Sequence, residues 1–369
     1  MSEMIPIPTP DPMPLPGPVW LMLTLLLVTF LLHLIAMNLT VGGALMAAIC
    51  SLRRKTDVFA GRLASDLTRL LPVSLAFTIT LGVAALLFVQ VLYGNLLYSS
   101  SILIGMFWIG VIPTLIIAYY GLYYSKSHPN DTRGLWLSLV LLLAIGFIYV
   151  NNFTLMMSPQ QWLEMYRHSA AGLNLNWTDP SLAPRYLHFM LGALAIAGFI
   201  IFVAGAWNRS TEYGQWMMHK GSHWFIAPTL LNYAVGMWFL LALPRNVLIT
   251  LFTADRLGAI LIALGMLFPI AAVAHVVLAI RTDKTIVHAK LAVLMTLLTM
   301  MVMVGLRQVV RAAYLDKYVQ LRELPVESQW SVISIFLILF VAGLLTVYIM
   351  VKQLHRGSGE STKLRAPSS

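Results

Sequence analysis

The chain has 369 residues, of which 59% are hydrophobic and 10% charged, and its mean hydropathy is +0.81. Soluble domains average roughly 45–50% apolar and about 25% charged residues, so this composition excludes a water-soluble enzyme, a disordered chain and a nucleic-acid-binding protein. The net charge of +10 is better explained by basic loops facing anionic lipid than by an acidic partner. A single cysteine, Cys50, excludes a disulfide framework, a c-type haem attachment, an iron–sulfur cluster and a thiolate zinc site. We therefore predict an all-α integral membrane protein.

Apolar stretches give the expected helices in chain order. Crossing about 30 Å of hydrocarbon takes about 20 mostly apolar residues. Nine stretches are long enough, and we predict one transmembrane helix in each: 19–52, 70–97, 101–124, 134–157, 184–207, 224–249, 257–281, 285–310 and 329–352. The two longest connections, 158–183 and 311–328, are each expected to hold a short interfacial helix, around Trp162–Arg167 and Tyr314–Leu321.

The two ends of the chain flank this domain of residues 19–352. Proline occupies every second position from Pro6 to Pro18. Because proline lacks an amide donor and fixes φ, residues 1–18 are expected to form an extended periplasmic arm. A solvated tail is favoured for this arm over a partner-docking segment. Residues 353–369 are expected to be a disordered cytoplasmic tail.

The basic residues predict the orientation. With the N-terminus outside, sixteen of the 24 Lys and Arg residues fall on the inner side and eight on the outer side. Since inner loops are normally enriched in Lys and Arg, we predict an N-terminus outside and a C-terminus inside.

The acidic residues limit the chemistry. All fourteen Asp and Glu residues lie in predicted loops, tails or helix ends. A carboxylate within the membrane is the usual group that binds and releases a proton in coupled carriers. An ion-coupled transporter is therefore disfavoured.

Histidines within the predicted helices are the candidate metal ligands. A neutral imidazole can ligate haem iron, and the alternative is a hydrogen-bonded structural histidine. We favour the structural role for His275 and His288, near the inner face. His188 stands one turn inside the outer face on a helix rich in Gly and Ala, which would let a flat macrocycle approach.

Two other residue types support a haem near the outer face. Buried propionates would need guanidinium partners, and ordinary interfacial snorkelling does not readily explain six outer arginines. These are Arg167, Arg185, Arg245, Arg256, Arg307 and Arg311. Methionines crowd the eighth stretch, where pliable packing is the more common role and iron ligation the rarer one.

The first predicted helix resembles subunit I of the cytochrome bd quinol oxidases. It carries His33, Leu39, Thr40 and Gly42 in the spacing His-x5-Leu-Thr-x-Gly. In that family the histidine ligates a haem of the oxygen-reducing site, so the resemblance implies a ligand role for His33.

Two further stretches resemble the same family. The fifth helix contains Arg185-Tyr-Leu-His188 and ends in Ala206-Trp207, which is similar to the family helix whose histidine ligates the low-spin haem b. The eighth ends in Leu306-Arg307-Gln308, similar to the family's Gly-Arg-Gln. The resemblance implies the family's architecture of two four-helix bundles plus one peripheral helix.

The chain also departs from the family. Val304 stands where the family has a glutamate that ligates the second high-spin haem, and the stretch Ser101–Tyr124 lacks the two glutamates that feed protons to oxygen. The long quinol-binding loop is reduced to about Thr250–Arg256. Two methionines are candidates for the other ligand of the low-spin haem. Met266, in the seventh helix, lies too deep. Met303 lies at a depth closer to that of His188, but in the eighth helix.

Together these features predict a bacterial inner-membrane subunit that transfers electrons through one or two haems b and has lost oxygen chemistry. It would link the quinone pool to a periplasmic cytochrome, foremost a multihaem c-type one, or to another membrane subunit of a respiratory complex. A quinone site could lie on this chain or on a partner subunit. The candidate iron ligands and propionate partners are His33, His188, Met303, Arg185, Arg245, Arg307 and Arg311. Two alternatives remain open: a true bd-type quinol oxidase subunit that reduces oxygen, and a haem-free permease or structural membrane subunit.

Overall fold

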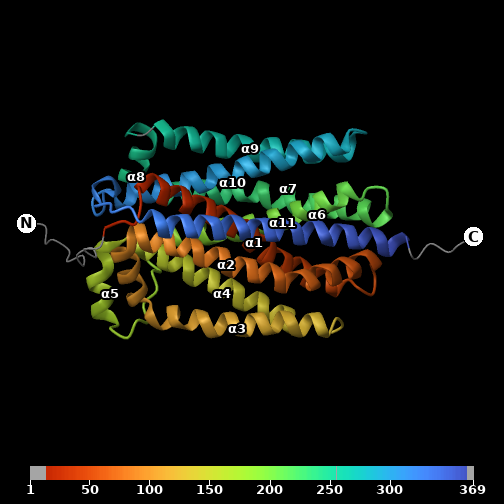
Figure 1. Cartoon of the computed structure of the whole chain (residues 1–369), viewed down its shortest axis with the longest axis horizontal. Helices are drawn as coiled ribbons and strands as arrows, with labels where there is room; N and C mark the ends of the chain where they lie inside the picture. Colours follow the sequence, from red (N-terminus) through yellow and green to blue (C-terminus); the bar gives the residue numbers. More distant parts are fainter. Residues whose placement is uncertain (1–13, 255, 364–369) are drawn as a thin grey trace, which may run out of the picture. The chain divides into compact units, whose positions relative to one another are not determined.

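The computed structural model describes residues 14–254 and 256–363. Eight helices in this part of the chain are long and apolar enough to cross a membrane (Figure 1). They are α1 (Val19–Leu52), α2 (Val58–Leu103), α3 (Gly105–Ser127), α4 (Arg133–Met156), α6 (Leu182–Trp207), α7 (Glu212–Leu241), α9 (Arg256–Arg281) and α10 (Thr285–Leu315). The prediction of an all-α membrane protein is confirmed. A ninth span, expected in α11 (Trp330–Lys363), remains a prediction; Trp330–Thr346 of this helix is apolar.

Short helices connect the long ones. They are η1 (Pro159–Gln161), α5 (Trp162–His168), α8 (Arg245–Ile249), a π-helical turn η2 (Thr250–Ala254) and η3 (Leu321–Glu323). The expected helix at Trp162–Arg167 is confirmed as α5, where the Trp162 Nε1–H donates a 2.9 Å hydrogen bond to the Leu155 carbonyl. The expected helix around Tyr314–Leu321 is wrong, because α10 continues as far as Leu315 and a turn follows it.

The described residues divide into two units. Unit 1 comprises residues 23–320, and unit 2 joins residues 14–22 to residues 321–363. Within unit 2, the Leu15 N–H donates to the Pro325 carbonyl at 2.7 Å and the Glu327 N–H donates to the Leu15 carbonyl at 2.9 Å. The last residues of the expected arm are thus extended and paired, while residues 1–13 lie outside the described residues. Helix α11 continues to Lys363, through the first part of the tail expected to be disordered, and residues 364–369 lie outside the description.

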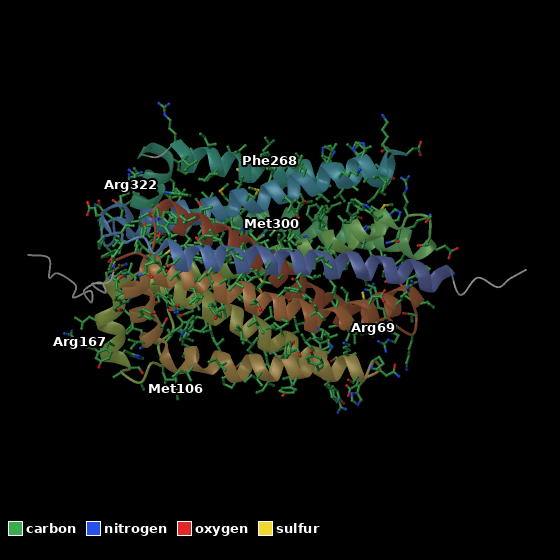
Figure 2. The ribbon with its side chains drawn as sticks, in the orientation of Figure 1. Arg69, Met106, Arg167, Phe268, Met300 and Arg322 are labelled. Carbon is green, nitrogen blue, oxygen red and sulfur yellow. The ribbon has the colours of Figure 1, made fainter. Side chains whose placement is uncertain are left out.

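Two helices of unit 1 begin earlier than their apolar stretches predict. Asp57 caps the N-terminus of α2, and Thr211 caps that of α7, each accepting a hydrogen bond from a backbone N–H of the first turn. The polar N-terminal segments of the two helices also meet, because the Tyr213 hydroxyl donates to the Asp66 carboxylate at 2.9 Å. Capping and polar contacts therefore extend these helices beyond their hydrophobic segments. Figure 2 shows Arg69, on α2, and Arg167, on α5, at opposite ends of unit 1.

Glycines bring the helices of unit 1 close together. The antiparallel helices α6 and α7 lie side by side (Figure 1), and a Cβ atom added to Gly221 on α7 would overlap the backbone nitrogen of Phe202 on α6. Helix α1 crosses α6 in the same way, since a Cβ atom at Gly42 would overlap the Ala193 carbonyl. Small residues permit this close approach. The α6–α7 pair is the frame that holds the site described next.

Candidate functional site

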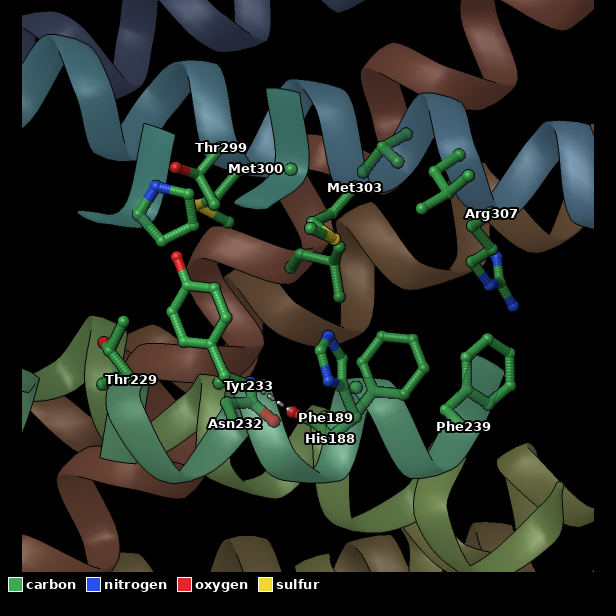
Figure 3. Close-up of a pocket in the computed structure, with 18 of the residues that line it drawn as sticks. His188, Phe189, Thr229, Asn232, Tyr233, Phe239, Thr299, Met300, Met303 and Arg307 are labelled. Atoms are coloured by element: carbon green, nitrogen blue, oxygen red, sulfur yellow. Dashed lines mark hydrogen bonds between the residues drawn. The ribbon is translucent and has the colours of Figure 1, made fainter. Parts of the chain in front are cut away.

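Five helices of unit 1 surround a cavity of about 290 Å³. Its walls come from α1, α6, α7, α9 and α10 and are mainly apolar, with a few polar side chains between them (Figure 3). Met237 on α7 and Met266 on α9 line the cavity and are 48% and 44% exposed, so it reaches the surface of the protein between these two helices. Its volume is at the lower end of the range typical of small-molecule and cofactor sites.

His188 and Met303 face this cavity from opposite sides. His188 projects from α6 and Met303 from α10, with the imidazole and the thioether directed toward the same space (Figure 3). Each lies against a glycine of a neighbouring helix. A Cβ atom at Gly236 would be 3.5 Å from His188 Cε1, and one at Gly265 would be 2.5 Å from Met303 Cε. A larger residue at Gly265 would therefore displace Met303.

Polar atoms without partners cluster around the cavity. Among the described residues, eight buried side-chain nitrogen or oxygen atoms lack a hydrogen-bond partner. Four of the eight belong to residues that line this cavity: Arg185 Nε, His188 Nδ1, Asn232 Oδ1 and Thr296 Oγ1. A buried polar group left unsatisfied costs about 1–3 kcal/mol. Such a concentration indicates that the site is completed by a bound group.

Three arginines lie at one end of the site. Arg185 and Arg311 are only 8% and 4% exposed, and Arg307 lines the cavity. Their guanidinium groups lie over aromatic rings, 4.9 Å from the Phe239 centroid for Arg185 and 4.3 Å from the Phe30 centroid for Arg307. Arg311 is 5.3 Å from the ring centroid of Tyr93 and donates to Gln308 Oε1 at 3.0 Å.

These arginines have no carboxylate partner within salt-bridge distance in the described part of the chain. Asp179 acts on Arg185 only from a greater distance, and the three positive charges also act on one another. Buried charges are normally paired, so three close and unpaired guanidinium groups favour binding of an anionic group. Arg307 and Arg311 also border a second cavity of about 10 Å³.

This donor set fits a haem b. Haem iron is commonly held by imidazole and thioether ligands, and guanidinium groups suit its carboxylate-bearing edge. Gly236 and Gly265 line the cavity and make room for the His188 and Met303 side chains. A site for a bare metal ion fits less well, because the described residues contain no group of three His, Cys, Asp or Glu side chains arranged to hold one.

His33 does not line either cavity. Its Nδ1 is 2.9 Å from the Thr78 carbonyl of α2, and its ring lies against Gly82, where a Cβ atom would be 2.8 Å from His33 Cε1. The ring therefore joins α1 to α2. Its role as an iron ligand remains a prediction.

The residues that follow His33 in the first motif also join helices. Thr40 Oγ1 is 2.8 Å from Ser74 Oγ and 2.9 Å from Thr78 Oγ1, both on α2, and Gly42 marks the crossing with Ala193 on α6. Helix packing thus accounts for Thr40 and Gly42 of this motif.

The other predicted site residues are distributed unevenly. His188, Met303, Arg185 and Arg307 line one cavity, and Arg311 lies beside Arg307. Arg245 is exposed at the start of α8 and is not one of the lining residues. Met266 lines the cavity although its depth argued against it.

The sequence analysis missed several polar residues of the site. Asn232, Thr229 and Thr296 all line the cavity. The available signal was that a polar side chain within a membrane span is costly and commonly functional.

His275 and His288 form the hydrogen-bonded pair that a structural role predicts, with their Nδ1 atoms 3.2 Å apart.

Comparisons with known proteins bear on the fold. No model of a known protein family matches the chain, and no curated protein matches its sequence. Among solved structures, the chain is similar to a chain of the bd oxidase from Geobacillus thermodenitrificans, with a TM-score of 0.66 and 14% identity. The match covers 93% of this chain and 100% of that one. The predicted resemblance to bd oxidase subunit I is confirmed at the level of fold: this chain is an all-helical membrane protein built like a bd oxidase chain.

Proposed function

We propose that the cavity between α1, α6, α7, α9 and α10 binds one haem b, and that the chain is an electron-transfer subunit of a membrane respiratory complex. The observation that carries the proposal is the clustering of four unpartnered buried polar atoms around a single cavity, beside three unpaired arginines. Two of these groups have a counterpart on haem b: the iron for the His188 imidazole, and the propionates for the guanidinium groups.

Different residues of the chain would bind the iron and the propionates of the haem. His188 would hold the iron from the α6 side, and Met303 is the candidate ligand on the α10 side. Arg185 and Arg307, with Arg311 beside Arg307, would hold the propionates. When bound, the haem supplies one-electron transfer, while its ligands, the nearby charges and the degree of burial set its reduction potential.

The partners follow from this assignment. The haem would lie near the outer ends of its helices, close to the periplasmic face if the N-terminus is outside. Electrons would pass between the quinone pool and a periplasmic cytochrome, with a multihaem c-type cytochrome as the foremost candidate, in a bacterial inner membrane. A second haem on His33 and a quinone site on this chain extend the same proposal.

An absorption spectrum of the purified protein tests the haem. We expect a low-spin haem b signal in the reduced-minus-oxidised spectrum, and its loss in His188→Ala, because the axial ligand is removed. His223→Ala is the matched control, since His223 is an exposed histidine on α7 that does not line the cavity. A wild-type protein without haem, or an unchanged spectrum in His188→Ala at normal protein levels, contradicts the assignment.

The fold itself favours a second candidate function. Because the chain is built like a bd oxidase chain, an oxygen-reducing quinol oxidase is the alternative. Quinol-driven oxygen uptake by the isolated complex separates the two functions.

A further inference from the structure

Asn232 on α7 lies beside His188. Its Nδ2 donates a 3.2 Å hydrogen bond to the His188 backbone carbonyl, which fixes the amide next to the imidazole (Figure 3). Asn232 Oδ1 and His188 Nδ1 are both buried and both without a partner. An orphaned acceptor and a ring nitrogen that can carry a proton thus sit on two residues that are already joined.

The position of the proton on an imidazole decides which of its nitrogens can bind iron. A neutral imidazole carries its proton on one nitrogen and a lone pair on the other. The hydrogen bond made by one nitrogen determines which nitrogen is free to bind iron, and it also raises the basicity of the ligand. If Nδ1 holds the proton and has an acceptor, Nε2 is free to bind iron.

We propose that Asn232 is the positioning residue for His188: its Oδ1 accepts a hydrogen bond from the His188 Nδ1–H when haem is bound. This inference rests on the proposed haem site. It names a residue that neither the sequence motifs nor the fold similarity assigns.

The surroundings leave Asn232 as the candidate acceptor on α7. The two other side chains of α7 that line the cavity and carry oxygen are Thr229 and Tyr233. Thr229 Oγ1–H donates to the Phe225 carbonyl at 2.6 Å, and the Tyr233 hydroxyl donates to the Met266 carbonyl at 2.6 Å. Both hydroxyls make these hydrogen bonds, whereas Asn232 Oδ1 is buried without a partner and belongs to the side chain that already donates to His188.

Glycines provide the space for this arrangement. Gly236, one turn after Asn232, lets the α7 backbone approach the His188 ring, since a Cβ atom there would be 3.6 Å from His188 Nδ1. Gly192 on α6 lies opposite the amide, where a Cβ atom would be 3.9 Å from Asn232 Nδ2. A side chain at either position would contact the imidazole or the amide, and glycine adds none.

The proposal predicts opposite effects of two substitutions on the haem. Asn232→Leu removes the acceptor at similar volume, so His188 becomes less basic, the oxidised haem is less stabilised and the midpoint potential rises. Haem affinity should also fall about 10–100-fold, the usual cost of losing such a partner. Asn232→Asp offers a stronger acceptor, so the midpoint potential should fall below that of the wild type.

A potentiometric titration of the low-spin haem in the purified full-length chain tests this, together with the haem content of each variant. Thr114→Val is the control, because it removes a hydroxyl from α3, a helix that contributes no lining residue to the cavity. If Asn232→Leu does not accumulate, Asn232→Asp keeps the shape of the side chain and carries the test. Full haem content with wild-type potential in the Asn232 variants overturns the inference and leaves the haem assignment intact. Absence of haem from the wild-type protein overturns both.

Discussion

At the residue scale, the candidate site is defined by side chains whose partners are missing from the chain itself. Elsewhere in the membrane region, hydroxyl groups such as Thr78 and Thr114 donate to a carbonyl one turn earlier on their own helix. Around the cavity the buried Thr296 hydroxyl has no such partner. His188 Nδ1 has none either, and Arg185 Nε has none although Arg185 Nη2 donates to Ser181 Oγ at 3.4 Å. Burial without partners is costly, so such a set is expected only where another molecule completes it.

Met303 gives a prediction at the same scale. Met303→Leu conserves the volume and should cost less than about 1.5 kcal/mol of stability, but it removes the thioether. If Met303 ligates the iron, the visible spectrum should change from low-spin to high-spin. Met300→Leu is the control, because Met300 lines the same cavity and packs in a cluster with Leu34 and Val304. A low-spin spectrum retained in Met303→Leu contradicts the assignment and makes Met266 the next candidate ligand.

The residues of the site were predictable as far as depth and residue type could identify them. His188, Arg185 and Arg307 stand out because a histidine and buried arginines are costly in a membrane. Asn232 and Thr296 do not stand out, because their importance depends on which helix face meets which neighbour. His33 is the opposite case, because its motif stands out in the sequence and predicts an iron ligand. The structure places its ring between α1 and α2.

At the element scale, hydropathy located the spans and missed their ends. Helix α2 was expected at 70–97 and runs from Val58 to Leu103, and α7 was expected at 224–249 and runs from Glu212 to Leu241. Their N-terminal ends are polar segments stabilised by caps and by the contact between Tyr213 and Asp66, which a hydropathy average does not register. At its other end, α7 stops at Leu241, and α8 covers the end of the expected stretch. The π-helical turn η2 follows, in the segment expected to be a loop.

The close packing of α6 against α7 can be tested by substitution. A methyl group at Gly221 would overlap the backbone of Phe202 and lie 2.7 Å from the Gly198 carbonyl, and a backbone cannot easily move aside. We expect Gly221→Ala to destabilise the protein by about 1–3 kcal/mol, as overpacking usually does, and to lower its unfolding temperature in detergent. Gly110→Ala on α3 is the control, because a Cβ atom there meets nothing within 4 Å. Equal unfolding temperatures for the two variants contradict the close packing of α6 and α7.

At the scale of the whole molecule, the chain keeps the fold of a bd oxidase chain at 14% identity. A fold can host different chemistry when the site residues change, so function has to be argued from the site. Val304 illustrates this point. It occupies the position where the resemblance implies a ligating glutamate, and it is 4% exposed in an apolar cluster with Leu34 and Met300. The structure therefore fills that position with packing rather than with a polar group.

The last prediction is that the protein does not reduce oxygen. Four-electron reduction of oxygen consumes protons, and a buried site needs titratable groups to deliver them. Helix α3 carries no Asp or Glu, and Val304 can neither ligate nor transfer a proton. The buried amides of the other spans order water but do not titrate near neutral pH; they include Asn38, Asn151 and Asn152.

An oxygen electrode measures this directly on the isolated complex supplied with a quinol. We expect no uptake above the rate of the quinol alone, in a sample whose haem is fully reduced by dithionite, which serves as the control for intact protein. A neighbouring subunit that supplies the missing acids is the physical route by which the prediction would fail. Cyanide-resistant, quinol-driven uptake at rates typical of enzymes, about 1–10³ per second, would establish that route and make the chain part of an oxidase.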